Sequence, residues 1–262
     1  MLLTCQYNSP VLRRNTRIQV ILPTPAQEGE PVKQNLKVLY LLHGLHGDES
    51  SWVRYSNIER YANDAGIAVV MPSVGNSFYQ DMVHGERYFT YMTRELPAYI
   101  QGLFPVSKKR EDTFIAGLSM GGYGAYFLGL RCPEQYSAIA SFSGALDVGF
   151  RVTPLPKMPN VPNVPAPFYA ESCFGDMSKI AGSDRDVFYL FEQAKQKGLL
   201  PRLYQSCCTK DFLYIMNVKS RQYLTAQGAE ITWHETEGMD HEWDFWDVEI
   251  RRALKWFLEE EG

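Results

Sequence analysis

The sequence Gly-Leu-Ser-Met-Gly at residues 117–121 constrains the fold of this chain more than any other segment. It follows an apolar run, Thr113–Ala116, and precedes a glycine-rich apolar stretch of helical character at residues 122–128. A glycine-flanked serine between a strand and a helix predicts a sharp, strained turn that projects the serine from the edge of a sheet. The free N–H groups of the helix below favour a developing negative charge. We therefore expect Ser119 to be a nucleophile; the alternative is a tight glycine turn with a bystander serine.

Apolar runs of strand length alternate with amphipathic helical stretches on both sides of this turn. Such alternation is typical of an α/β fold, a mostly parallel central sheet with helices on both faces. The predicted strands are Arg17–Leu22, Lys37–Leu42, Ala68–Met71, Thr113–Ala116, Ser137–Phe142, Arg202–Cys207 and Glu230–Glu235. The predicted helices are Ser56–Ala65, Thr90–Leu103, Gly121–Leu130, Arg185–Lys197, Asn217–Gln227 and Trp243–Glu259.

Length and composition limit the class of protein. The 262 residues fit a single domain spanning 1–262, and a net charge of −4 argues against nucleic-acid binding. No stretch reaches the roughly 20 apolar residues that cross a bilayer, and residues 1–7 lack the parts of a signal peptide. Five cysteines, with Cys207 and Cys208 adjacent, favour reduced thiols. We therefore expect a cytoplasmic protein acting on a small molecule, without nucleic-acid or membrane partners; the oligomeric state stays open, a homo-oligomer included.

One segment, Arg151–Pro167, interrupts the alternation because it carries six prolines. Prolines at this density exclude an α-helix and a central strand. The segment leaves the sheet after the strand that ends near Ser143, so residues 151–180 are expected to form an insertion within the domain. Its role is either a surface linker or a lid over the active edge of the sheet, since long loops are often functional.

A serine nucleophile in such a turn needs an acid and then a histidine, in that order along the chain. His234 falls inside a predicted strand, whereas His241 lies in the loop that follows it, where a general base belongs. Asp211 comes just after the penultimate strand and can hold the Nδ1–H of that histidine. Asp184 and Asp186 begin a helix, where capping explains them better. The sequence therefore predicts His241 as the base and Asp211 as the acid that orients it.

The oxyanion hole of such a site needs two main-chain N–H donors. Met120, the residue after the nucleophile, is expected to supply one of them. The other comes from the loop after the strand Lys37–Leu42, where Leu45 is the preferred donor and Gly44 the alternative.

The same loop carries His43, His46 and Asp48, which together allow a second interpretation as a metal site. Structural zinc takes four ligands and catalytic zinc three, and the rest of the chain offers no obvious completing ligand. We therefore expect no metal and no cofactor, and we interpret His43 as a histidine that braces the loop.

The chain resembles the tributyrin esterase and S-formylglutathione hydrolase (esterase D-like) group of α/β-hydrolases. The likeness covers most of the chain and is carried by YLLHG (40–44), SW (51–52), RELP (94–97), AGLSMGGYGA (116–125), TKDFLY (209–214) and the stretch from Gly238 to Trp246. It implies the α/β-hydrolase fold, with Ser119, Asp211 and His241 as a catalytic triad. The greater likeness is to the tributyrin esterases, which implies cleavage of short acyl esters, in some members of acetylated or feruloylated sugars. The chain departs from the group at Cys208, where the group has a glycine, and a cysteine adopts positive φ less readily.

The expected reaction is a two-step acyl transfer through an acyl-enzyme on Ser119, with water as the final acceptor. The same triad would serve a thioesterase acting on S-formylglutathione, or an acyltransferase, and the fold could also serve a non-catalytic binding protein. Trp52, Tyr123 and Trp243 flank the motifs. They are expected to line the substrate pocket or, with equal weight, to be plain core and rim aromatics.

Overall fold

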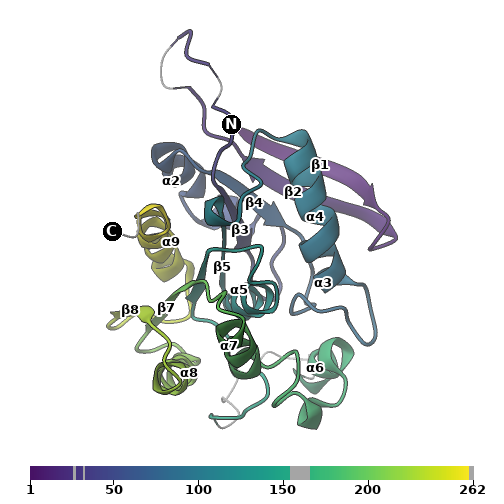
Figure 1. Ribbon diagram of the computed structural model, residues 1–262, viewed down its shortest axis with the longest axis vertical. Helices are drawn as coiled ribbons and strands as arrows, with labels where there is room; N and C mark the ends of the chain where they lie inside the picture. Colours follow the sequence, from purple (N-terminus) through teal and green to yellow (C-terminus); the bar gives the residue numbers. More distant parts are fainter. Residues whose placement is uncertain (26–27, 32, 154–165, 260–262) are drawn as a thin grey trace.

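A computed structural model describes residues 1–25, 28–31, 33–153 and 166–259 of the chain as an eight-stranded sheet with flanking helices (Figure 1). The strand order is β1-β2-β4-β3-β5-β6-β7-β8. The bounds are β1 Leu2–Ser9, β2 Arg14–Ile21, β3 Val38–Leu42, β4 Ala68–Pro72, β5 Thr113–Leu118, β6 Ala138–Phe142, β7 Arg202–Cys208 and β8 Ile231–Thr236. Strands β3 to β8 pair in parallel with one another, whereas β2 is antiparallel to both β1 and β4.

The parallel strands bury both of their faces. Every residue of β3, β4, β5 and β6 is buried, which explains their continuous apolar sequences. Successive residues of β3 enter opposite cores, Tyr40 on one face of the sheet and Leu41 on the other. All six parallel strands end at the same edge of the sheet, so the residues that follow them are brought together there.

Helices cover both faces of the sheet, as the α/β prediction requires. Residues of α4, α5, α7 and α8 join the strands in one apolar core, and residues of α1, α2 and α9 join them in the other. The bounds are α1 Ser51–Tyr55, α2 Ile58–Ala65, α3 Tyr88–Thr90, α4 Leu96–Leu103, α5 Met120–Arg131, α6 Ala166–Phe174, α7 Val187–Gln196, α8 Tyr214–Ala226 and α9 Trp243–Leu258. Shorter turns are η1 Tyr91–Glu95, which is π-helical, and the 3₁₀ turns η2 Arg110–Asp112 and η3 Met177–Lys179.

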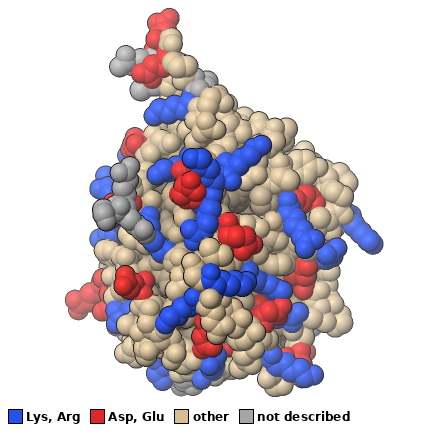
Figure 2. All heavy atoms as spheres, in the orientation of Figure 1, with Lys and Arg blue, Asp and Glu red and all other residues tan. Residues whose placement is uncertain are grey.

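The surface in the view of Figure 2 carries Lys and Arg side chains interspersed with Asp and Glu. A mixed surface of this kind fits the net charge of −4. Within the described part of the chain, none of the helices combines the length and the hydropathy that crossing a bilayer takes.

Strand β1, helix α1 and the start of α6 differ from the sequence prediction. Helix α1, Ser51–Tyr55, was not expected because its five residues are too few to show a helical period. Strand β1 was not expected, because as the edge strand it is exposed on alternate residues and has no buried apolar run. The sequence analysis excluded a helix from the whole of Arg151–Pro167. This prediction is wrong for the last two residues, Ala166 and Pro167, which begin α6. Proline is tolerated in the first turn of a helix because its missing N–H has no intrahelical partner there. Residues 154–165, the centre of the predicted insertion 151–180, lie outside the described residues, so its role as lid or linker stays a prediction.

Candidate active site

Ser119 occupies the junction between β5 and α5 in a strained backbone conformation, with φ 54° and ψ −118°. Such a conformation costs about 1–3 kcal/mol and persists only where the surroundings enforce it. Here the main chain packs closely against the glycines on both sides of the serine. A Cβ on Gly117 would lie 2.4 Å from the carbonyl oxygen of Gly121, and a Cβ on Gly121 would lie 2.6 Å from the carbonyl oxygens of both Leu42 and His43. The turn therefore requires glycine at both positions.

Main-chain hydrogen bonds fix the turn to the neighbouring strand. The Ser119 N–H donates to the carbonyl of Phe142 at 2.9 Å, and the Ser119 carbonyl accepts from the N–H of Ala145 at 3.2 Å. The same carbonyl accepts from the N–H groups of Gly122 and Tyr123 in the first turn of α5. The serine is thus held between β5, the end of β6 and the helix, at the carboxyl edge of the sheet.

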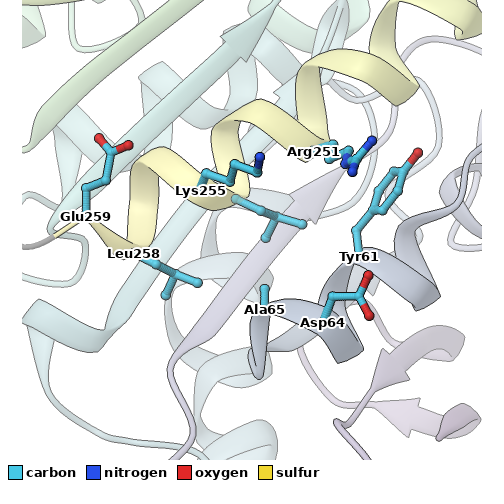
Figure 3. A pocket seen from close by; sticks show the side chains of 8 residues that line it. Tyr61, Asp64, Ala65, Arg251, Lys255, Leu258 and Glu259 are labelled. Carbon is cyan, nitrogen blue, oxygen red and sulfur yellow. The ribbon is translucent and has the colours of Figure 1, made fainter.

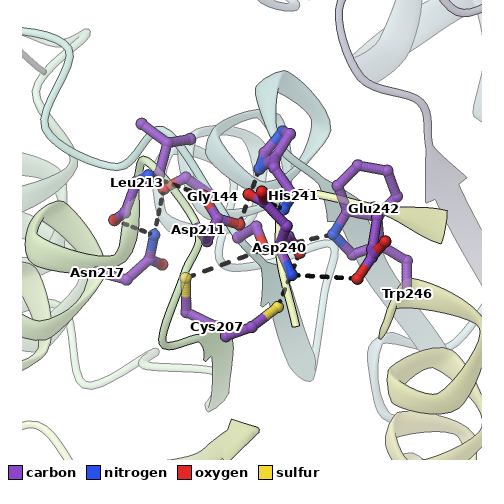
Figure 4. A network of polar contacts seen from close by, with 11 residues as sticks. Gly144, Cys207, Asp211, Leu213, Asn217, Asp240, His241, Glu242 and Trp246 are labelled. Carbon is purple, nitrogen blue, oxygen red and sulfur yellow. Dashed lines mark hydrogen bonds and ion pairs between the residues drawn. The ribbon is translucent and has the colours of Figure 1, made fainter. Parts of the chain in front are cut away.

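Asp211 and His241 form a hydrogen-bonded pair at that edge (Figure 4). His241 Nδ1 lies 2.8 Å from Asp211 Oδ2, and the side chain of the aspartate is fully buried whereas that of the histidine is 17% exposed. The other oxygen, Asp211 Oδ1, accepts from the N–H of Leu213 at 2.7 Å. A buried carboxylate with this geometry orients the imidazole and fixes its tautomer.

Aromatic rings hold the imidazole of His241 from two further sides. The Phe212 ring lies with its centroid 4.6 Å away, and Trp246 presents its edge at 4.8 Å. The Trp246 indole N–H donates to Ser143 Oγ at 3.3 Å, at the end of the strand that also fixes Ser119. His241 is therefore connected through Trp246 to the strand end that fixes Ser119. Sequence reasoning missed Trp246, although it lies one helical turn after Trp243 and so shares its face of α9.

The neighbouring acidic residues have other partners. Asp186 caps α7 by accepting from the N–H of Phe188 at 2.9 Å, as capping predicts. Asp240 accepts from the main-chain N–H of His241 at 2.7 Å. Among these carboxylates only that of Asp211 contacts the imidazole ring.

The two expected oxyanion donors lie on either side of Ser119. Met120 is the first residue of α5, and Leu45 lies in the loop after β3. That loop approaches the serine closely, because a Cβ on Gly44 would lie 3.3 Å from the Cβ of Ser119. Among the described residues, neither the Met120 nor the Leu45 N–H donates a hydrogen bond. Both N–H groups therefore remain candidates for the two donors that the sequence predicts.

His43 uses both ring nitrogens within the protein. Nδ1 lies 2.7 Å from the carbonyl oxygen of Gly44 and so donates to it, and Nε2 accepts from the N–H of Val74 at 3.2 Å. Burial lowers the pKa of His43, which favours this neutral tautomer. A ring with one nitrogen protonated and the other accepting has no lone pair for a metal, so the geometry favours a brace over a metal ligand.

The aromatic residues expected near the substrate divide into two groups. Trp52 and Tyr123 have 1% and 0% of their surface exposed, and each is hydrogen-bonded in the core, Trp52 to the Leu42 carbonyl and Tyr123 to Gln80. A substrate cannot reach them in this structure, which favours the interpretation of both residues as core aromatics. Trp243 is half-buried and packs edge-on against Trp52 at 5.2 Å.

Cys208 takes no unusual backbone conformation. It is the last residue of β7, in register with Thr236 of β8, so its backbone is extended. Its Sγ donates to the carbonyl of Asp240 at 3.0 Å. Burial, reinforced by nearby carboxylates, raises the pKa of Cys208 to about 12, so the thiol stays protonated. The replacement of glycine by cysteine therefore leaves the Asp211 turn intact.

A surface cavity of about 400 Å³ lies away from this edge, between α2 and α9 (Figure 3). Its lining includes Tyr61, Asp64, Arg251 and Lys255. None of the residues discussed above contributes to it, so we do not assign it to the active site.

Comparisons with known proteins show which family the chain resembles. Residues 9–257 match the Esterase family, whose description is "Putative esterase". The chain is 37% identical over 257 residues to an acetyl esterase of Caldicellulosiruptor saccharolyticus, covering 95% of each protein. It is similar to two solved Staphylococcus aureus structures, each at 32% identity and 99% coverage of both chains. One is the substrate-bound fluorophosphonate-binding serine hydrolase FphF, with a TM-score of 0.87, and the other is the S-formylglutathione hydrolase FrmB, with a TM-score of 0.84.

Proposed function

The chain belongs to the Esterase family of α/β-hydrolases and is a serine carboxylesterase, and from this premise we propose Ser119 as its nucleophile, His241 as its base and Asp211 as the orienting acid. One observation carries the assignment. The Asp211–His241 pair, at 2.8 Å, lies at the sheet edge where β5 delivers Ser119 in its strained turn. The four neighbouring strands β5 to β8 bring the three residues to that edge from positions far apart in the sequence.

The proposed reaction has two acyl-transfer steps. The Ser119 oxygen attacks the ester carbonyl while Nε2 of His241 takes its proton, and the N–H groups of Leu45 and Met120 bind the oxyanion. The imidazolium, stabilised by Asp211, gives that proton to the leaving alcohol as the carbon–oxygen bond breaks. Water then attacks the acyl-enzyme with His241 again as base, and the carboxylic acid leaves with the serine proton restored.

We infer a short acyl group as the substrate preference. The similarity to an acetyl esterase supports this, and so does the low exposure of Ser119, at 9%. A thioester substrate, S-formylglutathione, is the second candidate because of the 32% identity to FrmB. A cytoplasmic location is proposed because Cys5, Cys132, Cys173, Cys207 and Cys208 are all free thiols, as a reducing compartment allows.

The test combines covalent labelling with a substrate panel. A fluorophosphonate should label the wild-type enzyme and the Ser137→Ala control, which lies at the opposite end of β6, but not Ser119→Ala. Ser119→Ala should lose at least about 10⁴-fold in kcat on p-nitrophenyl acetate, judged from unrelated serine proteases. kcat/KM should fall from acetate to butyrate to octanoate esters. Labelling of Ser119→Ala, or a hundredfold preference for S-formylglutathione over the acetate ester, would reject the nucleophile or the ester assignment respectively.

A further inference from the structure

The loop between β4 and α3, residues 73–87, contacts the loop that carries the proposed oxyanion donor, residues 43–47. The hydroxyl of Tyr79 donates to the carbonyl of His43 at 2.9 Å. The N–H of Val74 donates to Nε2 of the same histidine at 3.2 Å. Both the main chain and the ring of His43 are therefore fixed by residues more than 30 positions later in the chain.

A third contact lies on the other side of the donor. The N–H of His46 donates to Oδ1 of Asn76 at 2.8 Å, and His46 has a positive φ of 64°. The peptide between Gly44 and Leu45 is thus held between two fixed points, His43 before it and His46 after it. Such bracketing restricts how far this peptide can rotate.

The orientation of that peptide follows from its carbonyl. The Gly44 oxygen accepts from Nδ1 of His43 at 2.7 Å and from the N–H of Gly47 at 3.2 Å. Because a trans peptide is planar, its N–H points opposite to its C=O. The Leu45 N–H is therefore directed away from the His43 ring, and any contact that fixes His43 also fixes the direction of this donor.

Tyr79 itself has almost no freedom to move. Its side chain is fully buried, and burial raises the pKa of its hydroxyl, so the group remains a hydrogen-bond donor. It follows Phe78 in a pair of residues with positive φ, 50° and 59°, which is strained for residues other than glycine. Its ring lies against α5, where a Cβ on Gly124 would come within 2.3 Å of it. The same helix begins at Met120, the other proposed donor, so Tyr79 links the two halves of the oxyanion hole.

We propose that Tyr79 is a positioning residue for the oxyanion hole: through His43 it holds the Gly44–Leu45 peptide so that the Leu45 N–H faces the oxyanion. This inference rests on the proposed function of Ser119. Tyr79 acts through another residue and does not touch the reacting atoms. Its contribution should therefore appear in the transition state more than in substrate binding.

The test removes the hydroxyl of Tyr79 and compares this variant with one that lacks the hydroxyl of another buried tyrosine. Tyr79→Phe keeps the ring against α5 and loses only the bond to His43. Tyr126→Phe is the control, because Tyr126 is equally buried and its hydroxyl donates to a main-chain carbonyl, that of Tyr204, away from the donor loop. For Tyr79→Phe we expect kcat on p-nitrophenyl acetate to fall about tenfold, less than the ~10²–10³ that loss of a whole donor costs in an unrelated protease. KM should change less than twofold.

A transition-state analogue separates positioning from general damage. A small boronic acid adds to the serine oxygen as a tetrahedral adduct that occupies the oxyanion hole, so its Ki should rise in Tyr79→Phe by the same factor as kcat/KM falls. Asn76→Ala, which removes the bond to His46, should show the same parallel change if Tyr79→Phe proves too unstable to assay. A kcat equal to that of the Tyr126→Phe control, or an unchanged boronic acid Ki, would overturn the proposal. If wild-type enzyme were not labelled at Ser119 by a fluorophosphonate, the proposed function would fail instead.

Discussion

The carboxyl edge of the sheet has two sides, one formed after β3 and β5 and the other after β7 and β8. A histidine on each side shows that the two are built differently. On the β3–β5 side, His43 is 1% exposed and both of its ring nitrogens bond to main-chain atoms. On the β7–β8 side, His241 is 17% exposed and is held by one carboxylate and by aromatic rings. The first histidine belongs to the scaffold, and the second is the residue that we propose as the general base.

This difference follows from what each side has to do. Oxyanion donors are most effective when they are fixed before the reaction, so they are main-chain groups held by close packing. A general base must reach the serine, the leaving group and water in turn, so it is a partly exposed side chain. We therefore expect the β3–β5 side to respond to steric changes and the β7–β8 side to changes of charge or hydrogen bonding.

The largest combined effect on turnover and stability is expected from a steric change on the β3–β5 side. In Gly121→Ala the new Cβ would lie 2.6 Å from two main-chain oxygens, of Leu42 and His43, which cannot move aside independently. We expect more than a 10³-fold loss of kcat and a loss of stability of about 3 kcal/mol, the upper end of the usual cost of overpacking. Denaturant unfolding and p-nitrophenyl acetate turnover measure both.

The control for this change is Gly102→Ala. Gly102 lies in α4, and nothing would lie within 4 Å of a Cβ there. This variant should be as active as wild type and more stable by about 0.5–1 kcal/mol, the usual gain for alanine over glycine in a helix. A Gly121→Ala enzyme with near wild-type activity would show that the strained turn is not sterically enforced.

The next effect is expected from a polar change on the β7–β8 side. Asp211→Asn keeps an oxygen for the Leu213 N–H and turns its amide N–H₂ toward Nδ1 of His241, which favours the tautomer unable to accept the serine proton. We expect kcat to fall by ~10²–10⁴, following the corresponding change in an unrelated protease, with stability changed little. Steady-state kinetics between pH 6 and 9 would measure the loss.

Asp240→Asn is the matched control for that prediction, because this neighbouring carboxylate bonds to the main-chain N–H of His241 and an amide oxygen can replace it. It should retain kcat within about threefold, well short of the loss expected for Asp211→Asn. Equal losses in the two variants would remove the special role of Asp211.

Sequence reasoning was most successful where local chain geometry determines the structure. The strand before Ser119, the glycines around it and the helix after it are contiguous, so their pattern is visible in the sequence. Strand β1 escaped prediction because an edge strand buries too little apolar surface to show a run. Tyr79 and Trp246 escaped because their roles depend on contacts with residues 36 and 103 positions away, which no local pattern records.

The smallest predicted effect concerns the pH dependence of stability. It tests whether burial keeps His43 from being protonated, as its contrast with His241 implies. Burial lowers its pKa in the folded state below the ordinary value of 6.5, so the unfolded chain binds more protons between the two pKa values. The stability contributed by neutral His43 is therefore present above about pH 6.5 and is lost as the pH falls below it. His43→Asn retains a donor for the Gly44 carbonyl but does not titrate. The drop in Tm from pH 7.5 to pH 5 should therefore be smaller in His43→Asn than in wild type, by about 2–4 °C for each kcal/mol of linked stability in a chain of this size. The other four histidines are common to both proteins, so equal drops in Tm would mean that His43 is protonated as readily in the folded protein as in the unfolded chain.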